Sequence, residues 1–292
     1  MSTLRVATYN IHKGVLRDFF GLRRVARIHD LRARLHELDS DLIFLQEVQG
    51  ENVRHQRQFE HWPSEPQDVF LAKAPSLKHT FETAYGRNAS YLHGHHGNAL
   101  LSRYPIVGQE NRDVSDHALE KRGVLHCRVN MDGREVHCFV VHFGLFARSR
   151  DRQLDALLEW IQGAVDPSAP LIIAGDFNDW RNALSERLCR RIGVVEVFDA
   201  CRPRGQAAQR AVYYMRDRLS ELGVSREAAI PGLPRTVRTA RTFPALVPWF
   251  RMDRIYQRGF RVQSASVLKG LEWSRLSDHS PLVADLELIP GP

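Results

Sequence analysis

The sequence predicts an α/β protein built from packed β-sheets with helices on their outer sides. Short apolar runs alternate with helix-like stretches along all 292 residues, and neither repeats nor a low-complexity linker divides the chain. Turn signals such as Asp132-Gly133 indicate hairpins in place of a strict strand–helix–strand order. We therefore expect packed sheets within a single domain spanning residues 1–292.

The first half of the chain contains one helix-like segment among several strand-like runs. Residues 21–39 place Leu22, Leu31 and Leu35 on one face at helical spacing, which predicts an amphipathic helix. Residues 42–48 are too apolar for an exposed strand, so we expect a central one. The other expected strands of this half are 4–11, 98–106, 123–131 and 136–143.

The second half continues this alternation. An amphipathic helix is expected over residues 149–165, with Ser149 as its N-cap. Residues 171–178 predict a buried strand that ends in polar residues, and Asp179 is a candidate cap for a helix that extends to residue 192. The remaining expected strands are 254–258, 260–268 and 281–289.

Basic residues gather in one segment. The formal net charge is +7 and the pI is near 9.5, and residues 202–241 hold nine arginines against three acidic residues. We interpret this segment as an Arg-rich insertion on the domain, with a helix at 206–223. Its arginines could track a phosphate backbone or contact an anionic membrane, or they could form the solvated face of a helix packed on the body.

The cysteines and the apolar runs indicate in which cellular compartment the protein is expected. Cys127 and Cys138 lie in strand-like runs, and no two cysteines have the CxxC spacing of a redox or zinc site. The first ten residues lack the apolar stretch of a secretory signal, and no run approaches the roughly 18 apolar residues of a membrane span. We expect a reduced, cytoplasmic protein.

Polar side chains stand where several apolar runs end. Burying an unpaired carboxylate is costly, so one such residue would indicate a solvated strand end, whereas a repeated pattern indicates a shared site. Several carboxylates in one site need a cation, and an oxygen-rich set with few nitrogens suits Mg²⁺ or Mn²⁺ better than Zn²⁺. The residues in question are Asn10, Glu47, His142, Asp176, Asn178, Asp253, Asp278 and His279.

Three further histidines stand close together in "HGHHGN", residues 93–98. Imidazole is the commonest neutral metal ligand, so His93, His95 and His96 are candidates for a zinc site. Two adjacent histidines point in different directions, however, and no carboxylate or cysteine lies nearby in the sequence. The stretch is therefore open to three interpretations: a metal site, a wall of a substrate groove, or a plain turn.

Seven motifs in chain order resemble those of the endonuclease/exonuclease/phosphatase superfamily, to which DNase I belongs. They are "ATYNIH", "LQEV", "GNALLSRYPI", "VVHFGL", "AGDFND", "MDRIY" and "LSDHSPL". The resemblance covers residues 4–288 and is closest to a small bacterial subgroup. It implies a four-layered α/β sandwich, in which two packed mixed sheets lie between outer helices.

The resemblance also implies a metal site. In the family, the residue that matches Glu47 is the principal metal ligand, and the one that matches Asp278 assists it. The counterpart of Asn10 supports the metal or a phosphate oxygen. Such a metal polarises the phosphoryl oxygen and offsets negative charge in the transition state. We therefore expect Mg²⁺, with Mn²⁺ as an alternative, at these three residues.

Catalytic roles follow from the same resemblance. Asp176 matches the residue that orients or deprotonates the attacking water, and Asn178 matches one that holds the scissile phosphate. His279 would donate a hydrogen bond to the phosphoryl group, with Asp253 fixing its tautomer. His142 matches a second phosphate-facing histidine of the DNase I and sphingomyelinase branches.

Two basic residues complete the expected substrate site. Lys121 and Arg122 stand where some members of the family place a phosphate-binding residue. On an extended strand, Asn178 would point the same way as Asp176 and face the same phosphate.

The function implied is that of a Mg²⁺-dependent phosphoester hydrolase, and we expect a phosphodiesterase acting on a nucleic acid or a phospholipid headgroup. The basic charge favours a DNA-acting endonuclease or exonuclease as one alternative. A sphingomyelinase-like phospholipid-headgroup diesterase in peripheral contact with an anionic membrane is another; the aromatic stretch at 247–250 could serve such contact, stack on bases or belong to the core. A non-catalytic anion- or lipid-binding protein is the third alternative. No protein partner is predicted.

Overall fold

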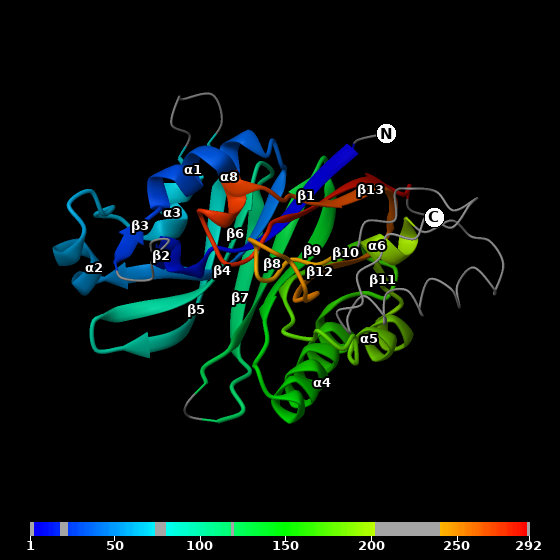
Figure 1. Cartoon of the computed structure of the whole chain (residues 1–292). Helices are drawn as coiled ribbons and strands as arrows, with labels where there is room; N and C mark the ends of the chain where they lie inside the picture. Colours follow the sequence, from blue (N-terminus) through cyan, green and yellow to red (C-terminus); the bar gives the residue numbers. More distant parts are fainter. Residues whose placement is uncertain (1–2, 18–22, 74–79, 118–119, 202–239, 291–292) are drawn as a thin grey trace, which may run out of the picture.

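Two six-stranded β-sheets pack face to face in this computed structural model, which describes residues 3–17, 23–73, 80–117, 120–201 and 240–290 (Figure 1). The first sheet runs in the order β13 (Phe260–Val267), β14 (Leu282–Leu288), β1 (Thr3–Asn10), β4 (Leu42–Asn52), β6 (Gly94–Ser102) and β5 (Glu82–Tyr91). The second runs in the order β11 (Val195–Glu196), β12 (Asp253–Arg258), β10 (Leu171–Asp176), β9 (Arg134–His142), β8 (Gly123–Met131) and β7 (Ile106–Asp113).

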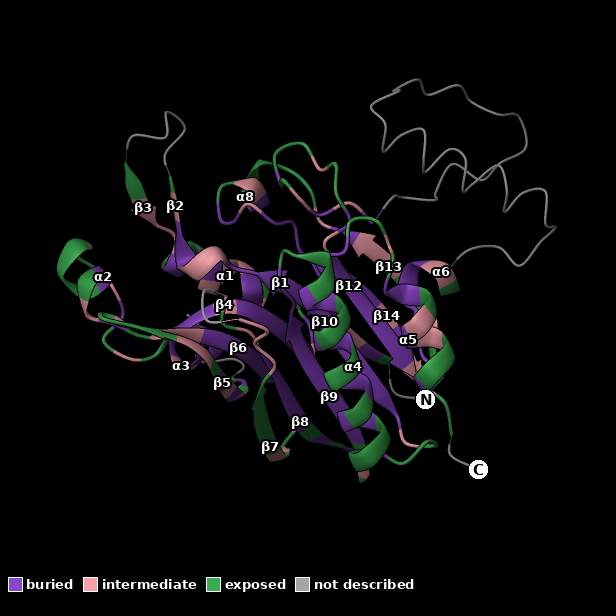
Figure 2. Cartoon of the chain, turned by 90° about the horizontal axis from the view of Figure 1, so that it is seen from below, coloured by how far each residue is buried: buried purple, intermediate pink, exposed green. Residues whose placement is uncertain are grey.

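Helices cover the outer faces of both sheets. The helices are α1 (Ile28–Glu37), α2 (Val53–Gln58), α3 (Gln67–Ala72), α4 (Ala147–Ala164), α5 (Ser185–Ile192), α6 (Val197–Ala200), α8 (Leu271–Ser274) and the 3₁₀ turn η1 (His12–Gly14). Figure 2 shows the buried strands of both sheets beside the partly exposed helices. The four-layered α/β sandwich expected from the sequence is confirmed.

Alternation along the strands decides which side chains fill which layer. In β1, Leu4 and Val6 belong to the cluster between the two sheets, whereas Ala7 and Tyr9 belong to the layer under α1 and α3. The outer layer of the second sheet packs in the same way on α4, where Leu154 and other apolar residues are fully buried. Each sheet is therefore apolar on both faces, as the run 42–48 predicted for a central strand.

Each sheet contains one parallel pair at its centre. In the first sheet β1 lies parallel to β4, and in the second β9 lies parallel to β10, while the other neighbours are antiparallel. Parallel strands bring their carboxyl ends to the same edge of a sheet. The polar residues that follow these strands are therefore collected at one edge of the sandwich.

Two predicted elements of the first half have different bounds. The helix expected over 21–39 begins at Ile28, because Arg24–Ala26 forms a short strand, β3, against β2 (Val15–Arg17). The strand expected over 98–106 begins earlier, at Gly94, and ends at Ser102. Asp132-Gly133 does form the expected hairpin turn, with positive φ at both residues.

Three local predictions for the second half were wrong. The helix expected from Ser149 begins at Ala147, and Ser149 Oγ donates to the Asp116 carboxylate instead of capping the helix. Asp179 accepts hydrogen bonds from the N–H groups of Ala183 and Leu184, but the helix after it begins only at Ser185. The strand expected over 171–178 ends at Asp176.

Two edge strands, β5 and β7, were not predicted from the sequence, whereas the edge strand β13 was. β5 and β7 lie at the ends of their sheets, and in β7 no residue is fully buried. Solvated edge strands need no apolar alternation, so the pattern that marks a buried strand is missing there.

The Arg-rich insertion falls largely on residues 202–239, outside the described ranges, so the helix at 206–223 remains a prediction. Cys127 and Cys138 are buried and unpaired, as expected. Within the described ranges, no helix has both the length and the apolar character that crossing a membrane requires.

Candidate active site

Five of the predicted residues meet at one edge of the sandwich, where strands of both sheets end or begin. β1 ends at Asn10, β9 at His142 and β10 at Asp176, while the antiparallel β12 begins at Asp253. In the second sheet, Asp176 lies opposite both His142 and Asp253. His279 reaches the same place from the loop before β14, and all five side chains are buried.

The His279 imidazole lies between two carboxylates. Its Nδ1 is 2.8 Å from Asp253 Oδ2, so Nδ1–H donates to that carboxylate, and its Nε2 is 3.7 Å from Asp176 Oδ2. Burial alone would lower the pKa of His279, but the negative charges of Asp253 and Asp176 outweigh burial and raise the pKa. This arrangement fixes the tautomer and keeps a proton on the imidazole.

Asp176 is held in place by donors on both of its oxygens. Asn10 Nδ2 donates to Oδ2 over 3.1 Å, and the backbone N–H of Asn178 donates to Oδ1 over 2.9 Å. His142 Nε2 lies 3.6 Å from Oδ2. Burial raises the pKa of the Asp176 carboxyl, although the His279 charge opposes this shift. A positioned carboxyl with a raised pKa is suited to accepting a proton from water.

Asn178 does not continue the strand, contrary to the prediction. Its φ of 49° lies in the left-handed region, so its side chain is not placed by strand alternation. Instead, Asn178 Nδ2 donates to the carbonyl of Phe143 over 2.9 Å. The residue thereby ties the end of β10 to the end of β9 and orients Asp176 through its own N–H.

The two predicted basic residues have different surroundings. Arg122 is half-buried, and its Nε donates over 3.2 Å to the same Phe143 carbonyl that Asn178 contacts. Its guanidinium also pairs with Glu120 at 3.0 Å. Lys121 is exposed, and its carbonyl accepts a hydrogen bond from Arg122. The structure therefore brings Arg122 to the site edge and leaves the Lys121 side chain in solvent.

Glu47 leaves the regular pattern of its strand. Its φ is 57°, and the pairing of β4 with β6 shifts between Leu45 and Val48, so Glu47 lies in a bulge. Lys13 Nζ lies 2.9 Å from Glu47 Oε2. Burial would raise the pKa of Glu47, but the charges of Lys13, His142 and His12 together hold it below its usual range.

Asp278 has a similar cationic neighbour. His12 Nδ1 lies 3.3 Å from Asp278 Oδ1, and Ser277 Oγ donates to the carbonyl of Asn10, which joins this loop to the end of β1. Burial would raise the pKa of Asp278, but its hydrogen bond with His12 lowers it. Sequence reasoning missed His12 and Lys13. The signal available was their position in "NIHKG", directly after the polar end of a buried strand.

The donor set fits a divalent metal ion at Glu47, Asp278 and Asn10. Glu47 Oε2 is buried, and among the described residues its ionic neighbour is Lys13 Nζ at 2.9 Å; hard oxygen donors of this kind are those that Mg²⁺ prefers. A second set, Asp176, Asp253 and His279, places one donor atom each within 4.8 Å of the others. Because Asp253 and Asp176 favour the protonated form of His279, this second set suits proton transfer better than metal binding.

The three histidines of residues 93–98 do not form a common site. His93 is exposed in a turn, whereas His95 and His96 are consecutive residues of β6. His95 pairs in register with Glu51 and His96 with Gln49. Successive side chains of a strand leave opposite faces, so the interpretation of this stretch as a plain turn was wrong for these two residues.

Comparisons with known proteins agree with the geometry. A family model described as the Endonuclease/Exonuclease/phosphatase family matches residues 7–279. The "Uncharacterized protein YbhP" of Escherichia coli (strain K12) is 38% identical over 288 residues, which cover 98% of this chain and 97% of that protein.

Solved structures share the fold. An endonuclease/exonuclease/phosphatase from Beutenbergia cavernae superposes with a TM-score of 0.69 at 20% identity, over 99% of this chain and 72% of that one. The mannosyl-6-phosphatase Bt3783 of Bacteroides thetaiotaomicron gives 0.65 at 18% identity, over 97% and 99% of the two chains. Members of the matched family are generally hydrolases of phosphoesters and typically use a divalent metal. The chain belongs to the Endonuclease/Exonuclease/phosphatase family.

Proposed function

We propose that this protein is a Mg²⁺-dependent phosphoester hydrolase that prefers phosphodiesters. The observation that supports this best is the buried group of Asp253, His279 and Asp176, in which the imidazole lies 2.8 Å from one carboxylate and 3.7 Å from the other. Such a group can move protons at one point, and the neighbouring oxygens can hold a metal at another.

The metal side of the site would be formed by Glu47, Asp278 and the Asn10 amide. A bound Mg²⁺ or Mn²⁺ supplies a Lewis acid that polarises a phosphoryl oxygen and offsets its growing negative charge. Lys13 and His12 lie within 3.3 Å of the two carboxylates, and they keep these groups ionised and ready for a cation.

The other side of the site handles the proton. Asp176, oriented by Asn10 and Asn178, accepts the proton of the water that attacks phosphorus. His279, held by Asp253, donates Nε2–H to a phosphoryl oxygen as negative charge develops. The charge of Arg122, which acts on His142, favours an anionic substrate, and His142 Nε2 lies 3.6 Å from Asp176.

Hydrolysis of bis-p-nitrophenyl phosphate with Mg²⁺ or Mn²⁺ tests the proposal. We expect turnover by the wild type, loss of turnover in Glu47→Gln and His279→Ala, and slower hydrolysis of the monoester p-nitrophenyl phosphate. Wild-type rates no higher than those of the variants, on diester, plasmid DNA and phospholipids alike, would reject the enzyme in favour of a non-catalytic binding protein.

The substrate class has two candidates. The net charge of +7 favours a nucleic acid, which nicking of plasmid DNA would detect. Exposed apolar side chains on loops next to the site favour a phospholipid headgroup. Trp180 and Phe250 pack edge to face at 5.7 Å, and the ring of Phe243 lies 5.0 Å from that of His279. Release of headgroups from anionic vesicles, with plasmid DNA left intact, would select the lipid.

A further inference from the structure

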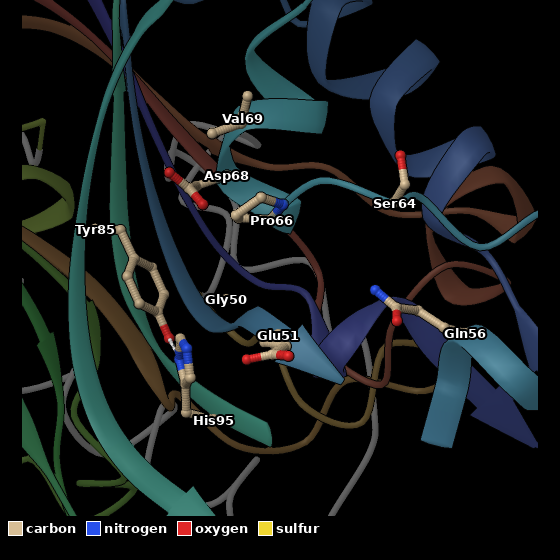
Figure 3. A pocket seen from close by; sticks show the side chains of 9 residues that line it. All are labelled: Gly50, Glu51, Gln56, Ser64, Pro66, Asp68, Val69, Tyr85 and His95. Carbon is tan, nitrogen blue, oxygen red and sulfur yellow. Dashed lines mark hydrogen bonds between the residues drawn. The ribbon is translucent and has the colours of Figure 1, made fainter. Parts of the chain in front are cut away.

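The adjacent histidines of β6 face two different environments. His95 lies on the face that packs toward α3, where Tyr85 Oη is 2.9 Å from its Nδ1. It lines a pocket of about 440 Å³ together with the buried Asp68 and with Glu51 (Figure 3). Gly50 leaves room for the His95 ring, because a Cβ at residue 50 would lie 2.0 Å from it. His95 is thus fixed by local packing.

His96 lies on the opposite face of the strand, toward the candidate active site. Two residues further along the same face, Asn98 Nδ2 donates to the carbonyl of Val140 in β9, which places this face against the second sheet. The pKa of His96 is affected by the charges of Lys13, Glu47 and Arg122, which belong to the site described above, and by that of its neighbour His95.

The His96 imidazole is not engaged by the fold. Among the described residues its buried Nδ1 has no hydrogen-bond partner, and the aromatic ring beside it is that of Tyr91, at a centroid distance of 5.8 Å. Burial, together with the Lys13 charge, lowers the pKa of His96 to about 4, so the ring is neutral and offers one donor and one acceptor near pH 7. Unpaired buried polar atoms are rare unless a ligand or water satisfies them.

We propose that His96 is a substrate-binding residue, whose imidazole contacts the phosphoester on the side of the site formed by Glu47 and Arg122. This inference rests on the proposed hydrolase function. A neutral donor there binds a phosphoryl or ester oxygen without adding a cation that would compete with the metal for Glu47.

Replacement of each histidine by phenylalanine separates substrate contact from strand packing. With bis-p-nitrophenyl phosphate and Mg²⁺, we expect His96→Phe to lower kcat/KM by about tenfold or more, mainly through KM, because one good hydrogen bond to an anion is lost. His96→Gln, which keeps an N–H donor, should recover most of the loss. His95→Phe, on the opposite face of the same strand, is the matched control and should stay within about twofold.

A second measurement keeps the inference separate from the hydrolase proposal. Histidine side chains labelled with ¹⁵N are followed by NMR while inorganic phosphate is added to the Mg²⁺-loaded wild type. We expect the His96 resonances to shift and those of His95 to stay unchanged. If the wild type hydrolyses nothing but His96 still shifts, the hydrolase proposal fails and the anion contact stands. Wild-type kinetics in His96→Phe, or no shift at His96, would overturn the inference.

Discussion

The two sides of the candidate active site are built in different ways. On the proton-transfer side, Asp253, His279 and Asp176 are fully buried and joined by direct short contacts. On the metal side, Glu47 and Asp278 are partly exposed and are balanced by the side chains of Lys13 and His12. The first side is held together by contacts among its own residues, whereas the second holds negative charge that Lys13 and His12 balance. A metal ion would therefore change the second side far more than the first.

Removal of the metal should have the largest effect on turnover. It disables the metal side of the site and leaves the proton-transfer side intact. Chelation by EDTA, or the change Glu47→Gln, should lower turnover of bis-p-nitrophenyl phosphate by about 10⁴-fold, since the Lewis acid is lost. The melting temperature should change little. Added Mg²⁺ should restore turnover in the chelated wild type but not in Glu47→Gln. Restored turnover in both proteins would show that Glu47 is not a metal ligand.

The change His279→Ala removes the imidazole of the proton-transfer side. Loss of a positioned proton donor should lower kcat by about 10²–10³-fold with the Mg²⁺ dependence unchanged. Titration of activity against Mg²⁺ in the variant and the wild type measures both quantities. A shifted Mg²⁺ midpoint would mean that His279 belongs to the metal site, as the set Asp176, Asp253 and His279 would allow.

Sequence reasoning located both sides from the same signal, the polar residues at the ends of apolar runs. The structure brings Asn10, His142 and Asp176 to one edge, because each ends a buried central strand that belongs to a parallel pair. It placed the Asn178 side chain wrongly, because a positive φ cannot be seen in the residue type.

The cations of the metal side were missed, although "NIHKG" places them directly after the polar end of a buried strand. His12 and Lys13 are ordinary polar residues of a turn, and only the bulge at Glu47 brings Lys13 within 2.9 Å of a carboxylate. Likewise, the edge strands β5 and β7 lack the burial that produces apolar alternation. What was missed therefore depends on backbone irregularity or on partners distant in sequence.

The change Lys13→Met tests the metal side alone and should have a smaller effect on activity. Lys13 and a metal ion compete for the same Glu47 oxygen, so loss of the lysine charge should lower the Mg²⁺ concentration for half-maximal activity by about three- to tenfold. Activity at saturating Mg²⁺ should stay within a few-fold of the wild type. The change Arg103→Met, which removes a surface ion pair with Asp39, is the control and should leave the midpoint unaltered. A raised midpoint in Lys13→Met would mean that Lys13 supports the metal site instead of competing with it.

The smallest expected effect is on the pH dependence of stability, and it concerns His126, a buried histidine remote from both sides of the site. His126 stacks on Phe139 with centroids 4.2 Å apart and lies 3.0 Å from a ring nitrogen of His137. Burial, together with the charge of His137, lowers the pKa of His126 to about 4 although Glu110 opposes this shift, whereas at His279 the carboxylates outweigh burial and raise the pKa.

The folded state therefore binds fewer protons than the unfolded state between pH 6.5 and about 4, and stability should fall as the pH is lowered through this window. Urea unfolding at pH 7.5 and 5 should show that His126→Phe, which keeps the stacked ring, loses about 1–2 kcal/mol less than the wild type over this interval. The exposed His93→Gln should lose as much as the wild type. Equal losses of unfolding free energy in all three proteins would show that other groups set the acid sensitivity. Burial at His126 would then not oppose its protonation.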